Sequence, residues 1–160
     1  MELRLARPDE LEAVGELTLA AYEDFTTGTE DSYRDHLRDA ARRAREAELW
    51  VAVDGGELLG TVTYCPPGSP WRELATDDEG EFRMLAVHPD RQGRGAGQAL
   101  AGQCERRARE HGATGMVLSS LAEMASAHRV YGRLGYARAP ERDWSPVDDV
   151  HLIAFVKELT

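Results

Sequence analysis

The chain has 160 residues, of which 42% are hydrophobic and 30% charged, and its formal net charge is −10. This length fits a single domain, residues 1–160, with a sizeable core. The acidic balance argues against nucleic-acid binding, which needs a basic surface. No apolar run approaches the roughly 20 residues of a membrane span, so we expect no membrane partner. The negative charge suits a cationic amine substrate, although solubility alone is the simpler explanation.

The cysteine content indicates an intracellular setting. Cys65 and Cys104 are the only cysteines, too few and too far apart for a disulfide scaffold or a metal cluster. We expect both to be reduced thiols of a cytoplasmic protein, and we expect no metal. The N-terminus reads as a short strand and not as a signal peptide.

The first half of the chain predicts a strand, two helices and a hairpin. Polar and apolar residues alternate over 2–6, which indicates a strand. Pro8 and the acids after it open a helix, 26–30 is a polar loop, and a charged second helix runs from Asp31 or Ser32 to about Glu46. Two β-rich runs at 49–53 and 57–64, around a Gly-containing turn, predict a hairpin.

The second half predicts a mixed sheet. Prolines end the hairpin, and a long loop carrying Trp71 runs to about Glu79; such loops are usually functional or disordered. Strands follow at 82–87, 116–119, 136–139 and 151–158, with helices to about His111 and at 124–134. A polar loop at 140–146 carries Trp144. The strand–helix–strand unit at 82–119 implies a parallel crossover, whereas the hairpins imply antiparallel pairing.

A glycine-rich loop follows the strand that ends at Val87. The alternate glycines of 93–97 remove Cβ atoms where a helix begins, so backbone N–H groups can approach an anion closely. A P-loop is excluded because the only lysine is Lys157, and a dinucleotide fingerprint needs glycine or alanine where Gln98 stands. The alternative is an ordinary strand–helix turn.

Two motifs in order resemble one family. Gln92-x-x-Gly95-x-Gly97, behind a His88-Pro89 turn, resembles the acyl-CoA loop of the GNAT N-acetyltransferase superfamily. The stretch 124–136 is similar to that family's second signature, Asn-x-x-Ala-x-x-x-Tyr-x-x-x-Gly-Phe/Tyr, which is matched by Ala127, Tyr131, Gly135 and Tyr136. The signature asparagine is Met124 here, which puts one family hydrogen bond to the CoA arm in doubt.

The resemblance implies an N-acetyltransferase that transfers the acetyl group of acetyl-CoA to a primary amine by direct attack in a ternary complex. It implies an α+β (α/β three-layer) fold: a mixed, mostly antiparallel sheet of six to seven strands, about four flanking helices, and splayed central parallel strands. The acceptor is expected to be a small-molecule amine in preference to a peptide amine, and homodimer formation stays open. A non-catalytic acyl-CoA sensor or interaction module on the same fold is the alternative, and a nucleotide-binding protein is a third class.

The resemblance also implies catalytic roles. Tyr131 matches the family's general acid, and Glu81 is the first choice for the general base, with Glu79 or a water chain as alternatives. The structural alternatives are a packing tyrosine and an exposed strand glutamate paired with Arg83. On a regular strand Glu81 shares a face with Arg83, Leu85 and Val87.

The binding residues implied for acetyl-CoA lie at the end of that strand, in the glycine loop and on the two following helices: Leu85, Ala86, Val87, Gln92, Gly93, Arg94, Gly95, Ala96, Gly97, Gln98, Ala127 and Arg133. Residues on segments flanking the cleft are expected to line the acceptor side: Tyr22, Phe25, Trp71, Glu141, Asp143 and Trp144. For each tryptophan the alternative is a loop anchor. The acid-rich run 77–81 and Asp143 favour a cationic acceptor.

Overall fold

The computed structural model describes residues 1–26 and 31–160. Its elements are β1 (Glu2–Leu5), η1 (Pro8–Glu10), α1 (Leu11–Thr26), α2 (Asp31–Arg38), α3 (Ala40–Glu46), β2 (Glu48–Asp54), β3 (Glu57–Cys65), β4 (Glu79–Val87), η2 (Pro89–Arg91), α4 (Ala96–Glu110), β5 (Gly115–Leu121), α5 (Ala125–Arg133), β6 (Ala137–Arg138), η3 (Pro140–Arg142), β7 (Trp144–Val147) and β8 (Val150–Glu158). Of the polar loop expected at 26–30, positions 27–30 lie outside this description.

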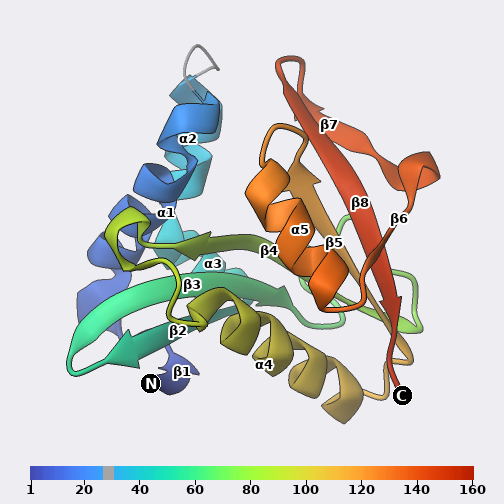
Figure 1. Cartoon of the computed structure of the whole chain (residues 1–160), viewed down its shortest axis with the longest axis horizontal. Helices are drawn as coiled ribbons and strands as arrows, with labels where there is room; N and C mark the ends of the chain where they lie inside the picture. The colour runs from blue at the N-terminus through green and yellow to red at the C-terminus, as the bar shows by residue number, and fades with distance from the viewer. Residues whose placement is uncertain (27–30) are drawn as a thin grey trace.

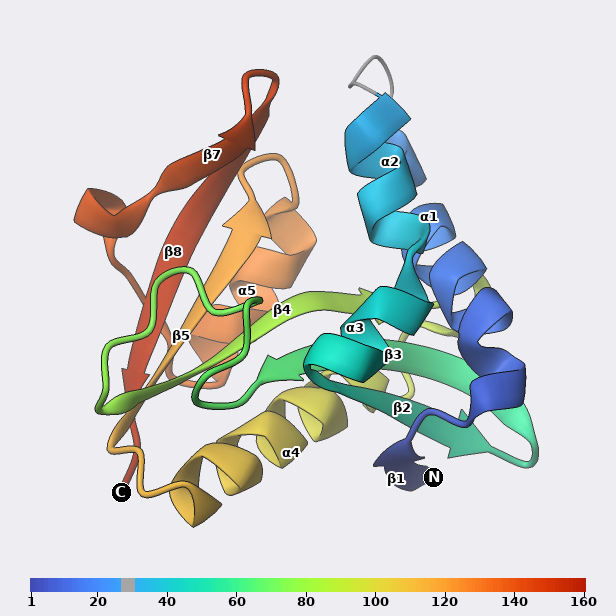
Figure 2. The ribbon, with the colours of Figure 1, turned by 180° about the vertical axis from the view of Figure 1, so that it is seen from behind.

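One sheet runs through the described chain in the order β1-β2-β3-β4-β5-β8-β6, with β7 paired to β8. Only β4 and β5 pair in parallel among these strands. Helices α4 and α5 cover one face, as Figure 1 shows, and α1, α2 and α3 cover the other, as Figure 2 shows. The expected α+β fold with three layers is therefore confirmed.

Two local expectations need correction. The second helix, expected to run unbroken to Glu46, is interrupted at Asp39, whose side chain accepts the backbone N–H of Arg42 and caps α3 as a separate helix. The loop expected at 140–146 contains strand β7, which brings the described sheet to eight strands. Pro146 is tolerated there because β7 lies at an edge, with an irregular register against β8.

Strand β4 contains a bulge at Met84. This residue has a φ of 54°. Thr61 and Thr63 of β3 are two residues apart, but their partners in β4, Ala86 and Arg83, are three residues apart. The extra residue reverses the side-chain alternation. Phe82 packs with the α4 cluster, and after the bulge so do Leu85 and Val87, while Met84 and Ala86 pack on the opposite face.

The bulge corrects the expected facing of Glu81. Glu81 and Arg83 both contact the loop 66–78, on the face away from α4. Leu85 and Val87 lie on the α4 face instead, because a regular alternation does not survive the inserted residue. The strand therefore presents charged residues to one face before the bulge and apolar residues to the other face after it.

The parallel strands separate just before the bulge residue Met84. Residues 79–82 of β4 pair with 115–118 of β5, and within the described chain the pairing of these strands ends at Phe82 and Leu118. β5 continues to Leu121 in register with β8. The expected splay of the central parallel strands is thus confirmed, and it leaves an edge of each strand open.

Apolar side chains are buried on both faces of the sheet. One cluster joins α4 and α5 to the strands, around Phe82, Leu100 and Tyr131. A second joins α1 and α2 to the other face, around Tyr22 and Trp71. Within residues 1–26 and 31–160, no helix combines the length and apolar character needed to cross a membrane.

The close approach of α1 to α2 yields a stability prediction. A Cβ at Gly15 in α1 would lie 2.1 Å from the carbonyl oxygen of Arg38, whereas a Cβ at Gly102 in α4 meets nothing within 4 Å. Both glycines are helical, so alanine improves helix propensity equally. We expect Gly102→Ala to raise the free energy of unfolding by about 0.5–1 kcal/mol and Gly15→Ala to lower it by about 1–3 kcal/mol. Thermal melting measures both changes, and equal shifts of the two variants would contradict this packing.

Candidate active site

The glycine loop lies directly after β4, where the strands have separated. Gly93 and Gly95 have φ values of 85° and 81°, a region that favours glycine. Gly95 is the N-cap residue of α4 and has no side chain to cap it, so the first-turn N–H groups of the helix stay available to a ligand. The side chains of Gln92, Arg94 and Gln98 are exposed around them. The arrangement presents several backbone donors and one guanidinium to an anion.

The opening between β4 and β5 begins in a narrow cavity. It is lined on one side by Arg83 and Met84 and on the other by 119–121 of β5, with Tyr22 and Tyr33 from the helical layer. The Tyr22 hydroxyl donates to the carbonyl oxygen of Leu85 at 3.4 Å. The carboxyl ends of two parallel strands thus border one cavity, and along the chain the glycine loop follows β4 and α5 follows β5 (Figure 1).

Tyr131 projects from α5 into the core on the α4 side. It is 4% exposed, and its ring lies 6.3 Å from Phe82 and 5.7 Å from Phe155, centroid to centroid. Burial raises the pKa of the Tyr131 phenol, so the hydroxyl keeps its proton at neutral pH. Across the residues described, that hydroxyl makes no hydrogen bond. It is therefore a proton donor held by packing alone.

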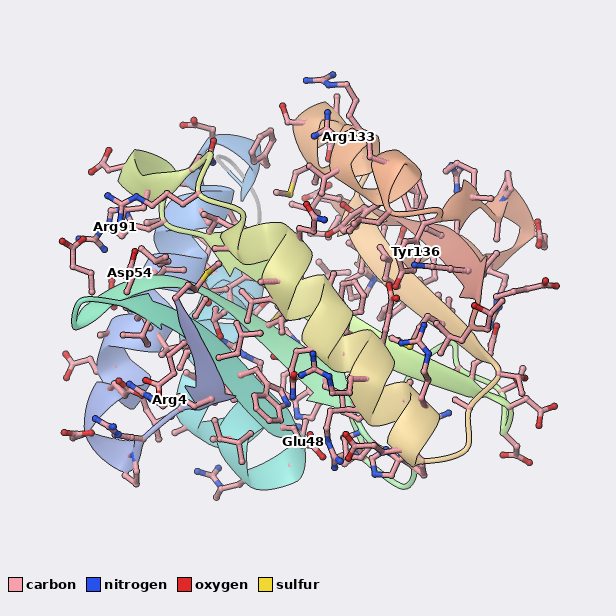
Figure 3. The ribbon with its side chains drawn as sticks, turned by 60° about the horizontal axis from the view of Figure 1, so that its bottom comes forward. Arg4, Glu48, Asp54, Arg91, Arg133 and Tyr136 are labelled. Carbon is pink, nitrogen blue, oxygen red and sulfur yellow. The ribbon has the colours of Figure 1, made fainter. Side chains whose placement is uncertain are left out.

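Two further residues of α5 were expected at the cofactor. Ala127 is partly buried against the α4 cluster. Arg133 lies in the last turn of α5 and is exposed (Figure 3). Met124, at the family's asparagine position, is the N-cap residue of α5 and makes no capping hydrogen bond through its side chain.

A second cavity of about 240 Å³ lies on the opposite side of β4. Its walls come from α2, α3, the loop 66–78, β4 and β7: His36, Arg42, Glu46, Pro70, Trp71, Glu73, Arg83, Trp144 and Pro146. We call it the tryptophan cavity. Both expected tryptophans line it, and each is anchored, since Trp71 Nε1 donates to Glu46 at 3.1 Å and Trp144 Nε1 donates to Ser119 at 2.9 Å. Arg83 borders this cavity and the narrow one.

Glu81 is fully buried behind these cavities. Its Oε1 accepts the backbone N–H groups of Glu73, Leu74 and Ala75, each at 3.0 Å. Its Oε2 is buried and has no hydrogen-bond partner among the described residues. Burial raises the pKa of this carboxyl, although the three N–H groups oppose the shift. Glu81 therefore holds the loop 66–78 with one oxygen and keeps the other free.

The alternative base, Glu79, lies in a different environment. Its carboxylate accepts hydrogen bonds from both Nη atoms of Arg142, at 2.7 and 2.9 Å. This hydrogen bonding lowers the pKa of Glu79, which makes it a weak proton acceptor. Of these two glutamates, only Glu81 has its pKa moved toward neutrality.

The remaining expected acceptor residues lie apart from both cavities. Asp143 accepts two hydrogen bonds from the Arg138 guanidinium, at 2.8 and 2.9 Å, and one from the backbone N–H of Ala154 at 2.9 Å. Glu141 is exposed on η3, and Phe25, near the end of α1, is 37% exposed. None of the three borders either cavity. The structure thus brings together Tyr22, Trp71 and Trp144, and leaves the two acidic residues elsewhere.

Sequence reasoning missed the basic wall of the tryptophan cavity. Arg83 had been considered only as an alternative partner for Glu81, and His36 and Arg42 were read as parts of a charged surface helix. His36 stacks on Trp71 with centroids 4.8 Å apart. One signal was available, because Arg83 interrupts the otherwise apolar run of residues 82–87, and a charge inside a buried strand usually has a partner or a function.

Comparisons with known proteins agree with this geometry. The family model described as Acetyltransferase (GNAT) family matches residues 11–136. Mycothiol acetyltransferase of Cellulomonas flavigena is 37% identical over 111 residues, which cover 64% of this chain and 32% of that protein. Mycothiol acetyltransferase of Nocardia farcinica is 33% identical over 108 residues, covering 64% and 35%. The chain spans about a third of the length of these relatives.

Solved structures share the fold at low sequence identity. A GNAT-family acetyltransferase from Staphylococcus aureus Mu50 superimposes with a TM-score of 0.76 at 15% identity, covering 99% of both chains. The PaiA N-acetyltransferase from Thermoplasma acidophilum, solved with coenzyme A, gives 0.71 at 14% identity over 99% and 98% of the chains. A putative acetyltransferase from Salmonella typhimurium, solved with acetyl-CoA, gives 0.68 at 22% identity over 100% and 94%.

The family match covers both motifs, the bulged strand and the separated parallel strands. It extends over most of the chain, and the structural neighbours share the arrangement of the whole described fold. The chain belongs to the GNAT acetyltransferase family.

Proposed function

We propose that this protein is an acetyl-CoA-dependent N-acetyltransferase that acetylates a primary amine of a small molecule by direct attack in a ternary complex. One observation carries the proposal: β4 and β5 part after Phe82, the glycine loop follows β4, and the ring of Tyr131 lies 6.3 Å from that of Phe82. The relatives named mycothiol acetyltransferase favour a small-molecule acceptor over a peptide. Release of CoA thiol from acetyl-CoA, measured over a panel of primary amines, tests it.

The residues present fit the co-substrate. The N–H groups from Gln92 to Gln98 are placed to bind its pyrophosphate, with the exposed Arg94 adding charge-assisted hydrogen bonds. The open edge of β4 from Leu85 to Val87 offers backbone groups to an extended amide chain, as a sheet edge does to a peptide. The exposed Arg133 on α5 is a further phosphate contact, and Ala127 contributes to the apolar packing of the same helix.

The chemistry requires proton removal from the amine, polarisation of the thioester carbonyl and protonation of the leaving thiolate. Acetyl-CoA supplies the activated acetyl group. Tyr131 protonates the thiolate, which its packing and its unused hydroxyl support. The backbone N–H of Val87 or its neighbour donates to the carbonyl oxygen. Glu81 accepts the proton of the amine through Oε2, the oxygen that the loop 66–78 leaves free.

Binding at the glycine loop predicts a paired result for two glycines. Gly95 and Gly112 flank opposite ends of α4 with nearly equal φ values of 81° and 80°, so valine strains the backbone similarly at both. We expect Gly95→Val to weaken CoA affinity at least about tenfold by placing a branched side chain at the anion site, and Gly112→Val to leave it near the wild-type value. Isothermal titration with CoA measures both. Wild-type affinity in a folded Gly95→Val variant would refute this placement.

The role of Tyr131 predicts a loss in rate without a loss in binding. Tyr131→Phe removes one hydroxyl and keeps the ring, so we expect kcat to fall by about 10²–10⁴-fold with little change in the KM for acetyl-CoA. Tyr64→Phe is the matched control, because that hydroxyl bonds to His111 at 2.8 Å, away from both cavities. Steady-state thiol release measures kcat. An unchanged kcat, with chemistry rate-limiting, would remove Tyr131 from the mechanism.

The raised pKa of Glu81 predicts a pH dependence. A base works only when deprotonated, so kcat/KM should rise with pH through the pKa of Glu81, which lies above the usual value for a glutamate. We expect Glu81→Gln to lose this rising limb. Glu79→Gln should keep it, because Arg142 holds the pKa of Glu79 low. Profiles measured with one acceptor decide the matter, and superimposable wild-type and Glu81→Gln profiles would restrict Glu81 to holding the loop.

A further inference from the structure

Arg83 is a buried cation held between two indole rings. The residue is 6% exposed, and its guanidinium carbon lies 5.5 Å from the ring centroid of Trp71 and 5.3 Å from that of Trp144. Such contacts stabilise a positive charge and fix the plane of the guanidinium. The side chain donates one hydrogen bond, from Nη1 to the carbonyl oxygen of Trp71 at 3.3 Å.

This cation has no ion-pair partner. Over residues 1–26 and 31–160, no carboxylate forms an ion pair with Arg83, and its other donors make no hydrogen bond. A guanidinium is a fork of several N–H donors, and leaving a buried charge uncompensated is unfavourable. Because Arg83 borders both cavities, its unused donors are placed where a ligand can reach them.

The acidic side chains of the tryptophan cavity do not supply the missing charge. Glu46 is already bonded to Arg42 Nε at 2.9 Å and to Trp71 Nε1 at 3.1 Å. Glu73 is exposed at the rim. Glu81, on the same face as Arg83, is held by three backbone N–H groups. The cavity therefore keeps an unneutralised cation at its inner end.

Two further arginines lie near Arg83, and one of them, Arg42, is paired with Glu46. Arg42 lies over the outer ring face of Trp71 at 5.6 Å, and Arg43 is fully buried behind, with Nε and Nη2 unpartnered among the described residues. His36 adds no negative charge, and burial together with Arg83, Arg43 and Arg42 lowers its pKa to about 4, so it is neutral at pH 7. The charges near the cavity that form no ion pair are therefore those of Arg83 and the buried Arg43.

We propose that Arg83 binds a carboxylate of the acceptor, so that the amine substrate is an amino acid or a closely related amino carboxylate. The guanidinium fork matches a carboxylate in two parallel hydrogen bonds, and two indoles flank it at 5.5 and 5.3 Å. The proposal rests on the acetyltransferase activity proposed above and names its acceptor class.

The position of Arg83 in the chain connects binding to chemistry. It directly precedes the bulge residue Met84, at the point where β4 leaves β5. A carboxylate held there places the rest of the acceptor beside the opening, within the cavity that Trp71 and Trp144 enclose. The cationic acceptor expected from the acidic residues is replaced by one that carries both charges, since Glu79 and Asp143 are already paired with Arg142 and Arg138.

The test compares amines that differ only in the carboxylate. Thiol release from acetyl-CoA is measured for the proteinogenic amino acids and for the C-terminal amide of each, at constant ionic strength. For the best acceptor, we expect kcat/KM for the acid to exceed that for its amide by about 10–100-fold, the range of a charge-assisted hydrogen bond. Turnover with equal kcat/KM for acid and amide would overturn this proposal and leave the acetyltransferase activity standing.

Variants of Arg83 test whether its guanidinium causes the preference for the acid over the amide. Arg83→Gln should lower kcat/KM for the acid to the level that the same variant shows for the amide. Arg83→Lys, which keeps the charge but not the fork, should fall between them. Arg109→Gln, an exposed arginine of α4, should keep the full discrimination. A folded Arg83→Gln enzyme that still prefers the acid as strongly as the wild type would overturn the assignment.

A binding measurement separates this proposal from the activity. Trp71 and Trp144 report on the cavity through tryptophan fluorescence, titrated with the same acids and amides in the presence of CoA. If no amine is acetylated, the proposed function fails, and tighter binding of acids than of amides still supports Arg83 as a carboxylate site. Equal binding of both series to the wild-type protein overturns it, including where Arg83→Gln does not fold.

Discussion

A positive φ at Met84, in the middle of a buried strand, is the constraint on which the site depends. A non-glycine residue in this region costs about 1–3 kcal/mol and persists only where its surroundings fix it. Met84 is 6% exposed and packs with Tyr22 and Tyr33, and these contacts fix its conformation. The inserted residue turns β4 away from β5, so the ladder between the parallel strands stops at Phe82. Without the bulge, regular pairing to Leu121 would close the opening.

The same bulge changes which residues of β4 face each side of the sheet. After it, Leu85 and Val87 lie on the α4 side with the glycine loop and Tyr131, where the co-substrate fits. Before it, Arg83 faces the loop 66–78 and the tryptophan cavity. One inserted residue therefore puts Arg83 and Val87 on opposite faces of the sheet, whereas strict alternation would put both on the same face.

Sequence reasoning recovered what is local and missed what depends on distant partners. The glycine loop and the Tyr131 helix are short motifs with a recognisable spacing, so the fold and the splay of the parallel strands followed from them. The bulge left no local signal, because Met84 has an ordinary strand composition around it. The pKa of Glu79 depends on Arg142, which lies 63 residues away in the sequence. The environment of Glu81 depends on the loop 66–78. Such contacts form only in the assembled fold, so the composition of the sequence does not reveal them.

The net charge of the chain does not predict the charge of the cavity, because composition does not show which residues the fold brings together. The chain carries a formal charge of −10, yet charge acts over about 8–10 Å at physiological salt, so the balance inside one cavity is independent of the total. Acidic residues near the site are bound to arginines or to backbone N–H groups, whereas Arg83 keeps its charge unmatched. The net charge of the chain is acidic, whereas Arg83 and Arg43 are buried cations that form no ion pair among the described residues.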